Sequence, residues 1–197
     1  MSKKGLTSLI LFFFAALFVY PQIFSIRAGA GIMRPQEDSF KEIYGNCLPL
    51  SLEVNVRLSD NYGLAVGLDW INEKGKALPL DQGGEEFLVH FKMISIPVSV
   101  FYEFSGRLGS VPLGIDLGLG VNWHSYKESW ETAELISRGK KLGLLVYGTV
   151  DFRLFSRVAL FTSLRYESVP TGKSSLLNEK INLGGVKLLA GIAFYLN

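Results

Sequence analysis

Residues 50–58 read Leu50-Ser51-Leu52-Glu53-Val54-Asn55-Val56-Arg57-Leu58, a strict alternation in which every even position is apolar and every odd position is polar or charged. Successive side chains of a β-strand point to opposite faces, so this pattern predicts a strand that separates an apolar from a polar environment. The same two-residue period recurs along most of the chain. A helical period competes with it in only one loop, and the pattern therefore predicts an all-β fold.

Eight segments carry the alternation, and we predict each of them as a strand of one antiparallel, up-and-down sheet. The fourth segment is irregular, because its apolar residues change from odd to even numbers at Ile94. This change predicts a β-bulge between Lys92 and Ile94. Pro97 follows in the same segment, where it cannot donate a hydrogen bond to the ladder. The predicted strands span residues 24–33, 50–58, 64–70, 87–104, 113–124, 142–154, 158–167 and 186–196.

The start of the chain predicts export. Lys3 and Lys4 form a positive beginning, and residues 9–19 are an apolar run of about eleven residues, which suits the core of a signal peptide and is too short to cross a bilayer as a helix. We therefore expect a signal peptide at residues 1–22 and a single barrel domain at residues 23–197.

Composition excludes several classes of function. Without Lys3 and Lys4, 18 of the 20 basic residues remain, against 18 acidic ones, so the exported chain is formally neutral. A neutral chain argues against a nucleic-acid partner, which requires a basic face. Cys47 is the only cysteine, which excludes an internal disulfide and a cysteine metal cluster. We predict no cofactor and no metal.

Alternation alone fits both a soluble barrel and a membrane barrel, and the connections favour the membrane barrel. Short and long connections alternate, which is the pattern of outer-membrane barrels. Aromatic residues on the apolar parity also lie near strand ends, as in the two aromatic belts of such barrels. The short connections are 59–61, 105–110 and 155–157, and the long ones are 34–49, 72–86, 127–140 and 170–180. The belt residues are Trp70, Trp123, Tyr166, Tyr102, Phe104 and Phe194.

The polar parity carries too many charges for a soluble, lipocalin-like barrel. These charges can pair inside a lumen but would destabilise a lipid-facing wall by several kcal/mol. Eight strands close a cylinder that side chains can fill, so we expect a lumen plugged by ion pairs, with a proton or ion path as the alternative. The predicted inward charges are Arg27, Arg57, Arg153, Arg165, Lys187, Glu53, Asp69, Glu103, Asp116, Asp151 and Glu167.

Three stretches resemble the small outer-membrane β-barrel proteins, the broad group that includes the outer-membrane W, X and opacity-type proteins. Residues 24–35 look like the opening strand of that group, and residues 94–104 with the glycine-rich 114–121 resemble its central hairpin. Residues 191–196 resemble the C-terminal signal read by the barrel-assembly machinery, although the chain ends in Leu196-Asn197 instead of a terminal aromatic residue. The resemblance implies a transmembrane barrel and specifies no activity.

His124 is the natural candidate for an enzyme, because some small outer-membrane barrels are lipid A deacylases with a serine, a histidine and a carboxylate at the outer rim. Here Ser125 follows His124 directly, and neighbouring strand residues point to opposite faces. The histidine-x-serine arrangement of those enzymes is absent, and His90 lies at another strand end. We predict no enzyme, and no catalytic, cofactor-binding or metal-binding residue.

The first long loop contains the one helical signal. Ser39 and Glu42 match a capping box and Gly45 a helix stop, which predicts a helical turn over residues 40–44. Its apolar residues would either cover the barrel mouth or form a contact surface. Cys47 lies in the same loop, and we expect it to be reachable from outside the cell.

Together these observations predict a monomeric eight-stranded antiparallel transmembrane β-barrel in the outer membrane, with both termini on the periplasmic side. Its expected role is structural or cell-surface interaction. The expected partners are outer-membrane lipid and, during biogenesis, the barrel-assembly machinery. The first alternative is a narrow conduit for small hydrophobic compounds, for which Leu145, Phe161, Leu189 and Ile71 supply a conceivable apolar row. A less favoured alternative is an enzyme that modifies outer-leaflet lipid.

Overall fold

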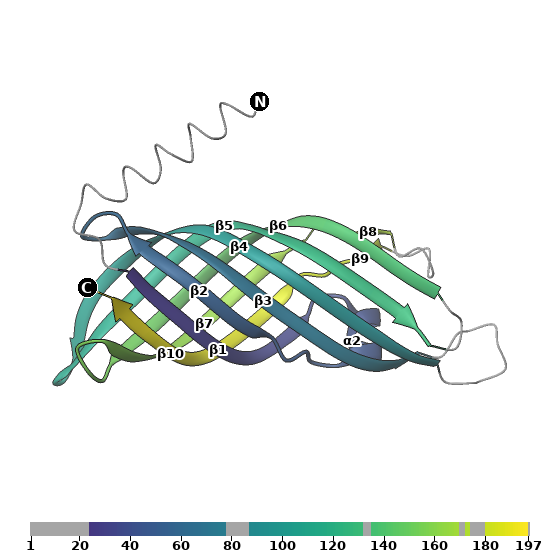
Figure 1. Ribbon diagram of the computed structural model, residues 1–197, viewed down its shortest axis with the longest axis horizontal. Coiled ribbons are helices and arrows are strands. Elements are labelled where there is room, and N and C mark those ends of the chain that lie inside the picture. Colours follow the sequence, from purple (N-terminus) through teal and green to yellow (C-terminus); the bar gives the residue numbers. More distant parts are fainter. Residues whose placement is uncertain (1–23, 78–86, 132–134, 170–171, 174–179, 197) are drawn as a thin grey trace, which may run out of the picture.

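The described residues form a closed antiparallel β-barrel (Figure 1). The computed structural model describes residues 24–77, 87–131, 135–169, 172–173 and 180–196; the predicted signal peptide lies outside them. Around the barrel the strands follow the order β1-β10-β7-β6-β5-β4-β3-β2, and β2 pairs with β1 to close the ring. The strands are β1 (Phe24–Pro35), β2 (Leu50–Arg57), β3 (Tyr62–Ala77), β4 (Phe87–Leu108), β5 (Val111–Trp130), β6 (Leu135–Arg153), β7 (Val158–Ser168) and β10 (Gly185–Leu196).

The predicted bulge in β4 is wrong. The register between β4 and β5 is unbroken from the pair Val89 and Trp130 to the pair Leu108 and Val111. Odd-numbered side chains of β4 therefore point into the barrel along the whole membrane-spanning part and beyond it. The apolar parity changes because the interior itself changes, from polar residues such as Ser95 to apolar ones such as Met93. The apolar part lies at the end of the barrel that carries the long connections, which we call the upper end.

Pro97 fits into the wall of the barrel because of the residue opposite. The register of β3 and β4 is the same on both sides of this point, and it places Pro97 opposite Gly67. A Cβ atom at Gly67 would come within 2.9 Å of Cγ of the Pro97 ring. Glycine at this position therefore leaves space for the proline inside the lumen.

Strands extend into two of the predicted long loops. β3 continues to Ala77, and β5 and β6 form a long hairpin in which Trp130 pairs with Leu135. Charged residues occupy alternate outward positions there, so apolar alternation could not reveal these extensions. In the fourth long connection, β8 (Gly172–Lys173) pairs with β9 (Lys180–Ile181).

The first long connection contains α2 (Asp38–Tyr44), as predicted, but it begins differently. Glu37 is the N-cap and makes no side-chain capping bond, and Ser39 lies inside the helix, so the predicted capping box is wrong. Gly45 ends the helix at φ 67°, a left-handed conformation that favours glycine. In the described part of the chain, no helix is long and apolar enough to cross a membrane.

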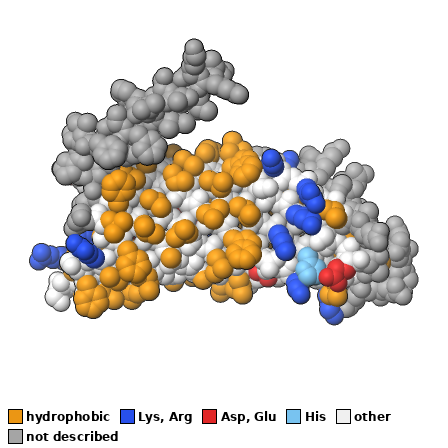
Figure 2. All heavy atoms as spheres, viewed as in Figure 1, with side chains coloured by type: hydrophobic (Ala, Val, Ile, Leu, Met, Phe, Trp, Pro, Cys, Tyr) orange, Lys and Arg blue, Asp and Glu red, His pale blue; other side chains and the backbone are white. Residues whose placement is uncertain are grey.

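The outside of the barrel is apolar over a broad band. Figure 2 shows hydrophobic side chains covering the middle of the visible face, and basic side chains between this band and the end that carries α2. Leu50, Leu52 and Val54 of β2 are exposed as predicted. Trp70 and Tyr166 also point outward at the upper edge of the band, as does Phe104 near the short turns. This surface fits a lipid environment.

Candidate functional site

The lumen is the first candidate site, and Arg27 on β1 lies at its centre. Its Nη1 donates to Glu53 at 3.1 Å, and its Nη2 donates to Asp151 at 2.5 Å and also to Asp116. All four side chains are buried. Because the strands β1, β2, β5 and β6 supply them, this cluster ties opposite walls of the barrel together.

A second cluster lies closer to the long connections. Lys187 on β10 donates from Nζ to Glu167 at 2.7 Å and to Asp69 at 2.9 Å. Arg165 lies 3.7 Å from Asp69 and donates to Glu53 at 2.8 Å, so Glu53 connects this cluster to Arg27. One continuous set of ion pairs therefore extends across the lumen from Glu167 to Asp151 and Asp116.

The short-turn end of the lumen has its own charges. Glu103 accepts a hydrogen bond from Arg57 and lies 3.7 Å from Arg153. The guanidinium of Arg153 also lies over the Tyr195 ring, 4.6 Å from its centre. With these contacts, each of the charged residues predicted to face the lumen lies within ion-pair distance of a residue of opposite charge.

Little room is left among these side chains. A cavity of about 10 Å³ lies at the level of Asn55 and Tyr195, near the lower limit for one water molecule. Tyr195 donates its hydroxyl to Asp151 at 2.7 Å, and Ser99 donates to the Tyr147 hydroxyl at 3.2 Å. Tyrosine hydroxyls therefore complete the polar layer next to the ion pairs.

His124 has a serine partner that the sequence analysis missed. Its Nδ1 lies 2.7 Å from Oγ of Ser95 on the neighbouring strand, and its Nε2 lies 3.9 Å from Oε2 of Glu167. The register of β4 and β5 places Ser95 opposite His124, and this register is the information that would have predicted the pair. The three side chains are 1 %, 0 % and 0 % exposed, so this serine, histidine and carboxylate set has no access to lipid or bulk water.

The second candidate site is the apolar upper mouth. Phe91, Met93 and Ile71 line it from the strands, and Phe40 and Tyr44 of α2 lie on top, so α2 covers the mouth. The phenol of Tyr44 donates to Glu128 at 2.7 Å and ties the helix to β5. Burial, and then the Glu128 carboxylate, raise the pKa of Tyr44 above its ordinary value. The space between α2 and the strand side chains is too small for a water molecule.

The expectation that Cys47 is reachable from outside is wrong. Its side chain is 1 % exposed, and its backbone pairs with Met33 at the end of β1. Burial, and then the Glu73 carboxylate, raise the pKa of the thiol to about 12. The first loop folds inward over the mouth, and the thiol packs with the apolar cluster beneath α2. The described residues hold no group of three or more His, Cys, Asp or Glu side chains suited to a metal ion.

No protein-family model matches the chain, and no curated protein matches it in sequence. Solved structures do match it in fold. Neisserial surface protein A is 18% identical with a TM-score of 0.59, covering 88% of this chain and 95% of its own. A major outer membrane protein of Thermus thermophilus is 16% identical with a TM-score of 0.58, covering 90% and 100%.

A third similar structure is that of Ail, the attachment invasion locus protein of Yersinia pestis, in complex with the heparin analogue sucrose octasulfate. It is 13% identical with a TM-score of 0.51, covering 89% of this chain and 97% of its own. The chain thus has the fold of the small eight-stranded outer-membrane β-barrels, which confirms the predicted fold class and the resemblance.

Proposed function

We propose that this protein is an integral outer-membrane β-barrel with a structural or cell-surface interaction role and a closed lumen. The observation that carries the proposal is the continuous set of buried ion pairs from Glu167 through Glu53 to Asp116, beneath a mouth covered by α2. A path through the lumen would separate these pairs and leave buried charges uncompensated. This is unfavourable, so such a lumen resists opening.

The proposed orientation places both termini in the periplasm. Phe24 pairs with Leu196, so the start of β1 and the end of β10 lie side by side, at the end of the barrel with the short turns (Figure 1). In outer-membrane barrels the short turns are periplasmic and the long connections are outside the cell. We also propose outer-membrane lipid and the barrel-assembly machinery as partners, a monomeric state, and no nucleic-acid partner.

A surface-interaction role is supported by the parts that extend beyond the apolar band. The upper hairpin of β5 and β6 carries charged outward side chains, including Lys127 and Arg138. Structurally similar proteins are described as a surface protein and an attachment protein. Loops and hairpins on a rigid scaffold are the common carriers of recognition.

Planar-bilayer recording of the purified protein tests the closed lumen. We expect no steady single-channel current from the wild type. Arg27→Ala should lower the free energy of unfolding without producing a steady current, because Asp116 and Asp151 lose their cation and Glu53 keeps only Arg165. Well-resolved, steady currents from the wild type would reject the closed lumen.

One observation favours the conduit for small hydrophobic compounds as the second candidate. The lumen is apolar at its mouth, where Ile71 and Met93 are buried in one cluster. The other three residues of the expected row, Leu145, Phe161 and Leu189, are buried in two separate clusters at the level of the ion pairs. Uptake of an apolar dye into liposomes tests it, with Phe40→Ala in α2 as the variant that loosens the cover. Uptake by the wild type above that of protein-free liposomes, increased by Phe40→Ala, would favour the conduit over the closed barrel.

We infer no catalytic role for Ser95, His124 and Glu167. Oε1 of Glu167 already accepts hydrogen bonds from Lys187 and Asn122, and the hydroxyl of Ser95 faces the interior. A lipid ester would have to pass through the barrel wall to reach the serine. Release of fatty acid from outer-leaflet lipid by the wild type, lost in Ser95→Ala, would reverse this inference.

A further inference from the structure

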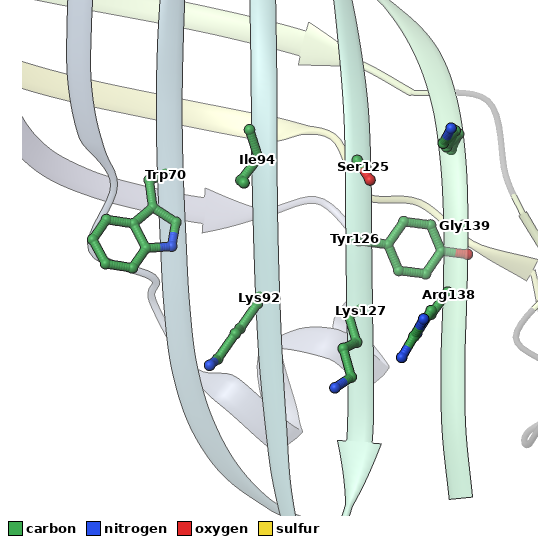
Figure 3. Close-up of a pocket in the computed structure, with 9 residues that line it drawn as sticks. Trp70, Lys92, Ile94, Ser125, Tyr126, Lys127, Arg138 and Gly139 are labelled. Atoms are coloured by element: carbon green, nitrogen blue, oxygen red, sulfur yellow. The ribbon is translucent and has the colours of Figure 1, made fainter.

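A row of three cations lies on the outer wall of the barrel. In the registers of β4, β5 and β6, Lys92 pairs with Lys127, and Lys127 pairs with Arg138. All three belong to the outward parity, and Figure 3 shows them side by side on adjacent strands. Neighbouring strands are about 4.8 Å apart, so the row spans roughly 10 Å of backbone.

Such a row is unfavourable without an anion. Like charges directly opposite each other on neighbouring strands destabilise a sheet. Within the described ranges, none of the three forms an ion pair with a carboxylate. The carboxylates nearby are engaged elsewhere, because Glu131 pairs with His90 at 2.7 Å and Glu128 points inward to Tyr44. Among the described residues, no carboxylate therefore compensates the positive charge of this row.

The cations border a hollow at the upper edge of the apolar band. A cavity of about 500 Å³ is lined by this row together with Trp70, Ile94 and Lys140. Nζ of Lys140 also lies 5.7 Å from the ring centre of Trp123. Tryptophan marks the membrane interface in such proteins, so the hollow lies at the depth of lipid headgroups.

We propose that Lys92, Lys127, Arg138 and Lys140 form a binding site for the phosphate groups of an outer-leaflet lipid headgroup. Arginine matches two phosphate oxygens at once, and the flexible lysines can reach one phosphate or two groups of the same headgroup. Trp70 and Ile94 supply an apolar floor that continues into the lipid-facing wall. A soluble anion would not use this continuity, which favours a lipid. The proposal rests on the proposed outer-membrane location.

Native mass spectrometry of the full barrel in neutral detergent tests the site. The probes are diphosphorylated lipid A, the same lipid without phosphates, and inositol hexakisphosphate as a soluble polyphosphate. We expect retention of the diphosphorylated lipid, and about tenfold or greater weakening in Lys127→Gln/Arg138→Gln. The control Arg107→Gln/Arg157→Gln removes the same charge from exposed positions at the opposite end of the barrel and should bind as the wild type does.

Three other outcomes would decide against the proposal. Equal retention of the dephosphorylated lipid would show that acyl chains alone are bound, and stronger binding of the soluble polyphosphate would assign the site to a soluble anion. Unfolding in neutral detergent should leave Lys127→Gln/Arg138→Gln at least as stable as the wild type, because the repulsion is relieved. A barrel that inserts into bilayers yet retains no phosphorylated lipid would reject this site and leave the proposed function standing.

Discussion

Tyr147 occupies the space that a side chain at Gly118 would need. The two residues are register partners on β5 and β6, and both face the lumen. A Cβ atom at Gly118 would overlap the Tyr147 ring. The Arg165 guanidinium lies over this ring, 5.8 Å from its centre, and the Tyr147 hydroxyl accepts a hydrogen bond from Ser99, so the glycine allows a tyrosine to pack among the ion pairs.

Gly118→Ala should therefore destabilise the barrel by about 1–3 kcal/mol, because a methyl group forces the ring out of its place. Urea unfolding in liposomes measures this change. The matched control is Gly148→Ala on β6, where a Cβ atom would lie 3.5 Å from Leu117 in ordinary contact, and its effect should stay near zero. In the Tyr147→Ala background, Gly118→Ala should cost much less than in the wild type, because the ring that it displaces is gone. Equal effects of the two glycine substitutions would contradict the packing argument.

Arg27→Met should destabilise the barrel by about 3–5 kcal/mol, because it leaves Glu53, Asp116 and Asp151 without the cation at their centre. The same unfolding measurement applies. Arg107→Met, at the exposed end of β4, is the control and should change stability by less than about 0.5 kcal/mol. A loss below about 1 kcal/mol for Arg27→Met would mean that water, not the ion pairs, stabilises the interior carboxylates.

The sequence was informative where one face of a strand meets lipid. Leu50 to Leu58 could be assigned to a lipid-facing strand because a single parity is apolar throughout. The inward charges could be named for the same reason, since a charge on the other parity has no stable place in lipid. Which charge pairs with which could not be predicted, because the contacts depend on the register and shear of the closed barrel.

The upper barrel was harder to predict because both of its faces differ from the membrane-spanning part. Inside, Phe87 to Met93 are apolar on odd positions, and outside, Lys92 and His90 are polar on even ones. Alternation shows only that the two faces of a strand differ, not which face points inward. In β4 the apolar face changes from the inside to the outside of the barrel, and in the sequence this change looks like a bulge. The pairing of Ser95 with His124 was missed for a related reason, because it joins two strands whose register was unknown.

Val54→Arg should destabilise the protein in lipid by about 2–4 kcal/mol, because its side chain lies on the exposed apolar face of β2 near the middle of the band. Asn72→Arg is the matched control: the residue also points outward, but beyond Trp70 at the edge of the band, where arginine reaches water. Liposome unfolding should rank the two variants in this order. The reverse ranking would place the membrane at a different level of the barrel.

Cys47 should react slowly with a membrane-impermeant maleimide added to intact cells, because α2 and the end of β1 bury it. The thiolate is the reactive form, and a pKa raised to about 12 keeps the thiol protonated at ordinary pH. Labelling should therefore stay slow throughout the pH range in which the cells remain intact. Asn46→Cys/Cys47→Ser moves the thiol to the exposed neighbouring position and should label at least about a hundredfold faster. Phe40→Ala/Tyr44→Ala, which removes the cover supplied by α2, should speed labelling of Cys47 itself. If wild-type Cys47 labels as fast as the Asn46→Cys control, the first loop does not fold over the mouth, and the closed barrel loses its upper seal.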